Sequence, residues 1–256
     1  MPFKIIICII AGMGAGLGTG FAGMSAAAVI SPMLITFLDM DSYLAVGIAL
    51  ASDVLASAIS AYTYGKNKNL DIRNGLIMMV SVLCFTLVGS YVASTVPKTT
   101  MGNFSVFMTF LLGIKFIVKP VVAPKARLQN ATAKQKAIRS VICGSMVGFV
   151  CGFIGAGGGM MMLLVLTTVL GYELKTAVGT SVFIMAATAL TGSVSHFAIG
   201  GAPDPVALVT CIISTLVFAL IAALIANKVS AKTLNRATGV VLVVLGSAII
   251  IVNRIK

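Results

Sequence analysis

Two ionisable side chains lie inside long apolar stretches, where they could carry chemistry away from water. Asp53 lies near the centre of 44–65, and His196, the single histidine, lies near the end of 176–203. A carboxylate in the hydrocarbon layer costs at least ~2.5 kcal/mol on insertion scales, so it is a functional candidate by default. Asp53 could carry a coupling proton, and His196 could relay protons or bind an anion when charged. The structural alternatives are an acid that only links helices and a histidine that marks a membrane boundary.

Two glycine-rich runs, with hydroxyls that follow the second, offer neutral donors for an anion. Backbone N–H groups at a helix N-terminus favour an anion, and glycine lets a ligand approach the backbone closely. The alternative is that small residues serve close helix–helix packing. The candidate anion-binding residues are Gly20, Phe21, Gly23, Ser25, Gly152, Phe153, Gly155, Gly157, Gly158, Gly159, Thr180 and Ser181.

The other reactive residue types lack a catalytic or metal-binding pattern. The five cysteines all lie in apolar stretches and form no CxxC motif, which indicates small buried side chains. A membrane-embedded enzyme would need a nucleophile with a base, a metal set or paired carboxylates. One histidine and one acid inside the apolar stretches do not supply these, so we expect no catalytic residue, no metal and no cofactor.

The composition of the chain is that of a membrane protein. Of 256 residues, 59% are hydrophobic and only 9% are charged, whereas a soluble domain carries about a quarter charged residues. Charge-poor segments follow one another along the chain, and about 20 apolar residues suffice to cross a bilayer. We count eight such segments, of which 99–114 and 237–253 are marginal in length. The sequence therefore predicts an all-α, polytopic protein of the cell membrane.

The net charge of +12 comes from basic residues between the apolar segments. They are densest from 115 to 139, where seven Lys or Arg occur without an acid. Loops of this kind are retained on the cytoplasmic side, so we predict that loop 115–139 is cytoplasmic. The expected partners are the lipid bilayer and a small anion, with protons as the candidate coupling ion. The charge pattern does not indicate nucleic acid, and the sequence does not indicate an oligomeric state.

The sequence contains an internal repeat. A shift of 132 positions places 20–23 on 152–155, Asp41 on Glu173, and 45–47 on 177–179. The order Gly-Phe-x-Gly, then an acid, then Ala-Val-Gly indicates a duplication. We predict a first transmembrane repeat over 1–118, a basic loop over 119–139 and a second repeat over 140–256.

The first segment of each repeat is too long for a single crossing. As straight helices, 5–38 and 140–172 would be about 50 Å long, and both carry small residues near the middle. Because glycine disfavours a helix by about 1 kcal/mol, we predict a break in each. Paired broken helices point to the binding site of a transporter. A segment that crosses once gives parallel repeats, and one that goes in and returns gives inverted repeats. Both satisfy the positive-inside rule, and we favour the inverted arrangement because it also explains the basic cluster at 228–236.

The Gly-Phe-x-Gly-x-Gly-Gly-Gly run at 152–159, the Ala-Val-Gly-Thr-Ser run at 177–181, and then His196, Gly200 and Asp204 resemble the TauE/SafE family. These are sulfite exporters and toluenesulfonate uptake permeases. The resemblance implies a multi-pass transporter of sulfite, organosulfonates or other small sulfur-containing or carboxylate anions, driven by a proton gradient. The first repeat departs from the pattern, with Ser-Ala-Ala at 25–27 and Ile-Ala at 48–49.

These observations together predict a secondary transporter of a small anion, with its site between the two glycine-rich breaks. A passive anion channel is the alternative. Saturable flux that responds to a proton gradient distinguishes the transporter from the channel.

Overall fold

The computed structural model describes residues 2–96, 133–154 and 158–226, with isolated positions at 114, at 118 and between 228 and 247. Within this part the regular elements are helices: α1 (Pro2–Ala22), α2 (Ala27–Leu38), α3 (Ser42–Lys66), α4 (Ile72–Ser94), α6 (Ala133–Ile154), α7 (Gly158–Thr168), α8 (Leu174–Gly200) and α9 (Pro205–Ala226). Five of these, α1, α3, α4, α8 and α9, are long and apolar enough to cross a membrane. The predicted all-α, multi-pass fold is confirmed, while segments 99–114 and 237–253 lie outside the described helices.

Acidic residues mark the starts of four helices. Asp41 accepts hydrogen bonds from the backbone N–H groups of Tyr43 and Leu44, at 3.0 and 3.2 Å, and so caps α3. Asp71 caps α4 in the same way, and Asp204 accepts from the N–H of Ala207 in α9. A carboxylate there satisfies free N–H groups and favours the helix dipole. The acid before α8 is Glu173, so the acids matched by the sequence repeat occupy equivalent helix starts.

Glycines four residues apart allow two helix pairs to pack closely. Gly12, Gly16 and Gly20 of α1 lie against α9, and Gly144, Gly148 and Gly152 of α6 lie against α4. A Cβ atom on Gly16 would lie 2.8 Å from the backbone nitrogen of Ala219, so a larger residue would push the helices apart. Small residues at this spacing bring membrane helices into contact. The packing role weighed for the glycines in the sequence describes Gly20 and Gly152.

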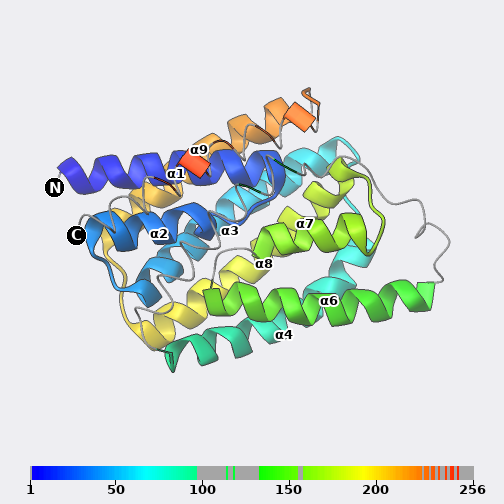
Figure 1. Cartoon of the computed structure of the whole chain (residues 1–256), viewed down its shortest axis with the longest axis horizontal. Coiled ribbons are helices and arrows are strands. Elements are labelled where there is room, and N and C mark those ends of the chain that lie inside the picture. Colours follow the sequence, from blue (N-terminus) through cyan, green and yellow to red (C-terminus); the bar gives the residue numbers. More distant parts are fainter. Residues whose placement is uncertain are drawn as a thin grey trace.

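The contacts of the glycines also fix the helix directions. In the α1–α9 and α4–α6 pairs, the residue numbers of the contact partners increase in the same direction along both helices, so the helices of each pair are parallel. In the central pair, Gly47 of α3 lies against His196 of α8, and Gly179 of α8 lies against Tyr64 of α3, so these helices are antiparallel. Short turns join α3 to α4 and α8 to α9. It follows that α6 runs opposite to α1, as Figure 1 shows.

These directions agree with the inverted arrangement of the two helix sets, α1–α4 and α6–α9. Figure 1 shows α1 beside α9 along the top, α4 beside α6 along the bottom, and α3 and α8 between them. Each outer pair therefore combines one helix from each set. A common origin of the two sets by duplication stays a prediction.

The short helices α2 and α7 complete the predicted broken segments. At 12 and 11 residues they are roughly 18 Å long or less, too short to cross the hydrocarbon layer. Helix α2 returns from the break toward the start of α3, so the first segment goes in and comes back (Figure 1). Most of α2 is buried in protein, which is the condition under which a helix end at membrane depth is tolerated.

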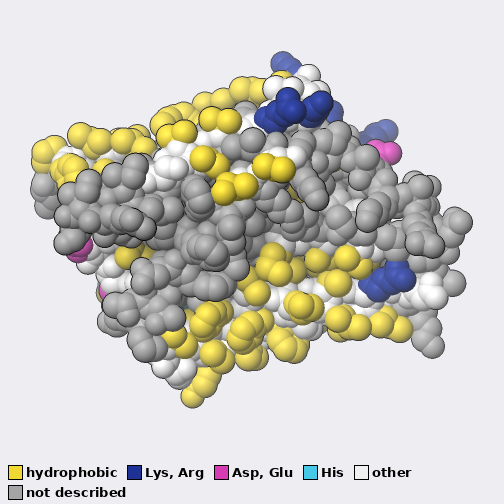
Figure 2. Space-filling view, in the orientation of Figure 1, with side chains coloured by type: hydrophobic (Ala, Val, Ile, Leu, Met, Phe, Trp, Pro, Cys, Tyr) yellow, Lys and Arg dark blue, Asp and Glu magenta, His cyan; other side chains and the backbone are white. Residues whose placement is uncertain are grey.

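The outer surface is apolar along the sides of the helices and charged at their two ends. Large apolar side chains such as Val80 of α4 and Ile213 of α9 are exposed, at 64% and 57%, and Figure 2 shows such side chains along the upper and lower edges of the molecule. A lipid environment accounts for an exposed apolar surface of this extent. At one end, which we call the basic end, lie Lys66, Lys68, Arg73, Arg139 and Lys175. At the opposite, acidic end lie Asp39, Asp41 and Asp204, together with Lys4.

Candidate functional site

The first helix break is a sharp turn inside the protein. Helix α1 ends at Ala22, and Gly23 follows with a φ of +62°, a left-handed conformation that glycine adopts without strain. The N–H of Gly23 donates to the carbonyl oxygen of Thr19 at 2.9 Å. The N–H of Ala27, the first residue of α2, donates to the hydroxyl of Ser25 at 3.3 Å. The C-terminus of α1 and the N-terminus of α2 therefore meet in a buried place.

Asp53 of α3 points into this first break and is completely buried. The hydroxyl of Ser57 donates to its Oδ1 at 2.8 Å, and that of Thr19 lies 3.5 Å from the same oxygen. The hydroxyl of Ser25 and the backbone N–H of Ala26 also face the carboxyl group. Among the described residues, Oδ2 has no hydrogen-bond partner. The N-terminus of α2 thus faces a carboxylate that the protein itself supplies.

The second break lies against the first. Helix α6 ends at Ile154 and α7 begins at Gly158; the intervening Gly155 and Gly157, both predicted site residues, lie outside the described part. Gly158 lies against Cys151, and a Cβ atom added to Gly158 would lie 2.9 Å from the Sγ of Cys151. A Cβ on Gly159 would meet the backbone of the first break, 2.6 Å from the nitrogen of Ser25. The structure therefore brings Gly159 together with Gly23 and Ser25.

Of the two neighbouring hydroxyls of α8, Ser181 lies at the junction of the breaks. A Cβ on Gly23 would collide with the Ser181 hydroxyl, and this hydroxyl donates to the carbonyl oxygen of Val178 at 2.8 Å. The two predicted aromatic residues pack against apolar groups. Phe21 is partly buried against the core, and Phe153 stacks on Phe149 with ring centroids 5.8 Å apart.

Thr180 lies elsewhere, in a hydrogen-bonded cluster near the basic end. Its hydroxyl accepts a hydrogen bond from the backbone N–H of Asp71 at 3.1 Å. The Asp71 carboxylate accepts from the hydroxyl of Tyr172 at 2.8 Å and from the side chain of Asn74 at 2.7 Å. Burial raises the pKa of Tyr172 above its ordinary value, and the bond to Asp71 raises it further. This cluster ties the turn between α3 and α4 to the start of α8.

We therefore expect Thr180→Val to lower stability rather than to act directly on a ligand. Valine has nearly the same shape but cannot accept the hydrogen bond from Asp71. Leaving a buried N–H group without a partner costs about 1–3 kcal/mol, and this N–H group is partly buried. Thermal unfolding of the purified protein should show this loss, whereas Thr180→Ser should stay close to the parent. A stable Thr180→Val variant that binds its anion more weakly would instead place the hydroxyl at the ligand.

Two side chains of the central helices bind carbonyl oxygens at the ends of α1 and α6. The hydroxyl of Tyr64 donates to the oxygen of Gly20 at 3.1 Å. In the other set, Nε2 of His196 lies 3.1 Å from the oxygen of Gly152, and Nδ1 lies 3.1 Å from that of Tyr43. Positions 64 and 196 differ by the same 132 residues as the glycines. Sequence reasoning missed Tyr64, although the repeat offset would have pointed to it.

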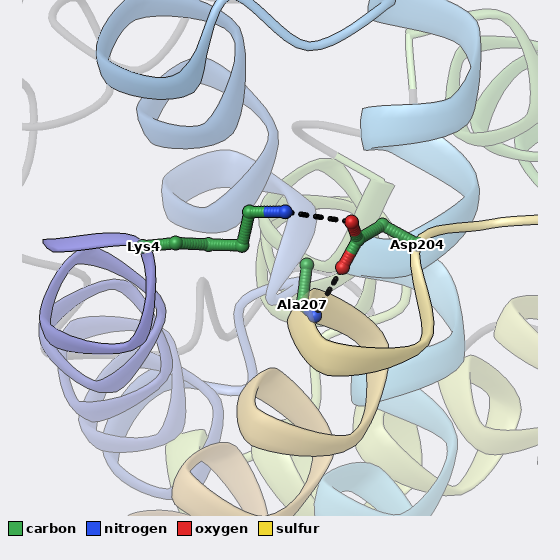
Figure 3. Close-up of polar contacts among 3 residues, drawn as sticks. All are labelled: Lys4, Asp204 and Ala207. Carbon is green, nitrogen blue, oxygen red and sulfur yellow. Dashed lines mark hydrogen bonds and ion pairs between the residues drawn. The ribbon is translucent and has the colours of Figure 1, made fainter. Parts of the chain in front are cut away.

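An ion pair joins the two helix sets at the acidic end. Nζ of Lys4 in α1 lies 2.7 Å from Oδ2 of Asp204, which precedes α9, and Figure 3 shows both side chains meeting beside Ala207. The hydrogen bond from Lys4 lowers the pKa of the Asp204 carboxyl, and the N–H of Ala207 lowers it further. Both side chains are about one third exposed, so solvent screens the pair.

Asp204→Asn should therefore cost little, at most about 1 kcal/mol at neutral pH. Because the pKa of Asp204 is lowered in the folded protein, its contribution is present at neutral pH and is lost as the pH falls through that pKa. The melting temperatures of parent and variant should differ slightly near neutrality and converge below about pH 4. A difference that persists in acid would show that the charge of Asp204 is not its cause.

The profile of the sulfite exporter TauE/SafE family matches residues 8–249. The chain belongs to this family. Its relatives include "Probable membrane transporter protein YunE" of Bacillus subtilis, 25% identical over 96% of this chain and 97% of the relative. A second Bacillus subtilis protein, "Probable membrane transporter protein YdhB", is 23% identical over 87% and 90%. "Probable membrane transporter protein MJ0441" of Methanocaldococcus jannaschii is 24% identical over 83% and 81%.

This TauE/SafE protein is thus a membrane transporter, and the resemblance seen in the sequence is confirmed. The junction of its two helix breaks combines backbone N–H groups, the hydroxyls of Ser25 and Ser181, and the carboxyl of Asp53. In the described residues no cluster of three or more His, Cys, Asp or Glu could hold a metal ion. In general, N–H and hydroxyl groups donate hydrogen bonds, and a carboxyl group binds and releases a proton.

Proposed function

We propose that this protein is a proton-coupled secondary transporter of a small anion that binds at the junction of the two helix breaks. The most suitable substrates are sulfite, an organosulfonate, or a related sulfur-containing or carboxylate anion. One observation carries the proposal: the buried carboxyl of Asp53, with Oδ2 unpartnered among the described residues, lies where the breaks meet. An intramembrane acid in such a place is a candidate for proton transfer.

The position of Asp53 gives a physical reason for coupling. At an effective dielectric constant of 20, two like unit charges 4 Å apart repel each other by about 4 kcal/mol. An anion beside Asp53 would therefore bind far better once the carboxyl is protonated. By linkage, the bound anion favours the proton by the same free energy. Proton and anion would then bind together and be released together.

The donors at the junction favour an oxyanion over a neutral solute. Backbone N–H groups and hydroxyls are neutral, so they attract an anion less strongly than a fixed Lys or Arg would and allow its release. Helix α7 begins at the junction, and its N-terminal dipole favours negative charge. In the first break the corresponding position is already taken by Asp53, so the anion is expected on the side of Gly158 and Gly159.

The charge distribution supports an orientation in the cell membrane. Lys and Arg gather at the basic end (Figure 2), and α6, whose residues 133–139 belong to the predicted loop 115–139, starts there. Because basic residues are retained in the cytoplasm, the basic end would face the cytoplasm and the Lys4–Asp204 pair would face outward.

Flux measurements in proteoliposomes test the function. Sulfite, toluenesulfonate, thiosulfate and acetate should be compared, each with and without an imposed proton gradient. We expect at least one to show saturable uptake that the gradient accelerates. Rapid flux that neither saturates nor responds to the gradient would support the passive anion channel instead.

A further inference from the structure

Both ring nitrogens of His196 in α8 face hydrogen-bond acceptors, and a neutral imidazole cannot donate to both of them. It is fully buried, and each of its ring nitrogens lies 3.1 Å from a backbone carbonyl oxygen, that of Gly152 at Nε2 and that of Tyr43 at Nδ1. Carbonyl oxygens only accept hydrogen bonds. A neutral imidazole has one N–H donor, whereas the imidazolium has two. In the neutral ring, one nitrogen lone pair therefore faces a carbonyl oxygen.

At the equivalent position in the other helix set, a side chain with one donor makes the corresponding contact. Tyr64 binds the carbonyl oxygen of Gly20 with a single hydroxyl, as His196 binds that of Gly152. The surroundings match as well, because Gly179 lies against Tyr64 and Gly47 lies against His196. A single donor thus suffices to satisfy the end of the first long helix. The contact of Nδ1 with Tyr43 is additional.

We propose that His196 is a proton-binding site, distinct from Asp53, in which the proton completes hydrogen bonds from the ring to α3 and α6 at once. Proton uptake converts the contact between a lone pair and a carbonyl oxygen into a hydrogen bond. It creates the imidazolium near the C-terminal end of α6, where the helix dipole favours a cation. The ring of Tyr43, with its centroid 4.0 Å from that of His196, adds an aromatic face beside the charge.

The titratable groups nearest to His196 lie on α3 and α6 and at the start of α3. On α3, Tyr43 contacts the ring, and its own hydroxyl donates to the carbonyl oxygen of Ser90 in α4 at 3.1 Å. On α6, Cys151 precedes Gly152, and at the start of α3 the Asp41 carboxylate is held by two backbone N–H groups. Within the described residues, no carboxylate forms an ion pair with His196. Histidine is the side chain whose unperturbed charge change falls between about pH 5 and pH 8.

The site also bears on transport, and this part rests on the proposed function. Gly152 lies two residues before the end of α6, so His196 binds next to the second break, on whose side the anion is expected. A cation there attracts the anion, and the anion in turn favours the proton on His196. Proton binding would also hold α6 against α3 and α8, and proton loss would release one of these contacts.

Nitrogen NMR of the protein with labelled histidine tests the site directly, because His196 is the single histidine in the chain. The protein must be purified with a tag that contains no histidine. We expect one pair of ring nitrogen signals that moves, between about pH 8 and about pH 5, from one protonated nitrogen to two. The measurement should be repeated with toluenesulfonate, a strong-acid anion that does not itself titrate in this range. A ring that keeps a single protonated nitrogen down to about pH 5 in both conditions would overturn the proposal.

His196→Tyr provides the matched variant, because it installs the residue that serves the equivalent position in the other set. It keeps a donor for Gly152 and removes the site that titrates near neutrality. If Tyr does not fit, His196→Gln also keeps a donor. In an Asp53→Asn background, the anion affinity that remains should still vary with pH with His196 present and should lose that variation with either replacement. Unchanged pH dependence in both would contradict the link to the anion. The NMR titration needs only protons, so it stands or falls independently of the transport assay.

Discussion

Asp53→Asn should abolish the accumulation of anion driven by a proton gradient while leaving anion exchange measurable. Asparagine has almost the same shape and can still accept the hydrogen bond from Ser57, which lies 2.8 Å from Oδ1 in the parent. It cannot take up or release a proton. A neutral side chain at the junction leaves the anion site permanently free of the repulsion that we estimate at about 4 kcal/mol. Anion can therefore still bind and exchange, but its movement is no longer tied to a proton.

The measurement is uptake into proteoliposomes with and without a proton gradient, beside exchange of labelled anion across the same membranes. Ser52→Ala is the matched control, because Ser52 precedes Asp53 on α3, is equally buried, and donates to the carbonyl oxygen of Ile48 within its own helix. We expect this control to accumulate anion like the parent. If Asp53→Asn kept the pH dependence of uptake of the parent, Asp53 would not carry the coupling proton.

Gly159→Val should eliminate anion binding. A Cβ atom at this position would come within 2.6 Å of the backbone nitrogen of Ser25 and would also collide with the carbonyl oxygen of Gly23. Both are main-chain atoms of the first break, which cannot yield as the end of a flexible side chain can. The two breaks must then move apart, and the donors of α7 lose their alignment. We expect the affinity to fall by roughly 100-fold or more, which corresponds to about 2.7 kcal/mol.

Binding isotherms on purified protein test this, together with thermal unfolding to establish that the variant is folded. Gly65→Val is a suitable control, because an added Cβ there meets only the side chain of Leu70 at 3.3 Å. Gly158→Ala is an intermediate case, since its Cβ would press on the side chain of Cys151 rather than on backbone. If folded Gly159→Val bound the anion like the parent, the glycine run would serve packing alone and the site would lie elsewhere. Gly157, another predicted site residue of this run, lies outside the described residues.

The broken helices were predictable because they depend on local properties of the chain. Segment length against bilayer thickness and the helix-breaking tendency of glycine suffice to predict that 5–38 and 140–172 divide. The helix starts at Asp41 and Asp71 follow from equally local capping preferences. The four-residue spacing of Gly12, Gly16 and Gly20 also indicates a helix-packing surface, and it recurs at Gly144, Gly148 and Gly152.

The orientation of side chains about each helix could not be predicted in the same way. Thr180 and Ser181 are adjacent, so they point about 100° apart on α8, and only one of them can face the breaks. The rotation of α8 is set by its packing on α3, and it turns Ser181 toward Gly23 and Thr180 toward Asp71. Asp53 was found because it is an acid in an apolar segment. Its contact with the first break was not predicted from the repeat, because the equivalent position in the other set is Met185, which is not an acid.

Because α1 packs on α9 and α4 packs on α6, we do not expect the two halves of the sequence to move as separate rigid bodies. Each outer pair takes one helix from each half, and in α1–α9 the backbones touch through Gly16 and Ala219. Movement of one half as a rigid body against the other would break the close glycine contacts of both outer pairs, which we call the glycine seams. The seams are instead suited to stay closed, so that α1 moves with α9 and α4 moves with α6. Any rocking would then hinge on the antiparallel α3 and α8, the two helices that carry Asp53 and His196.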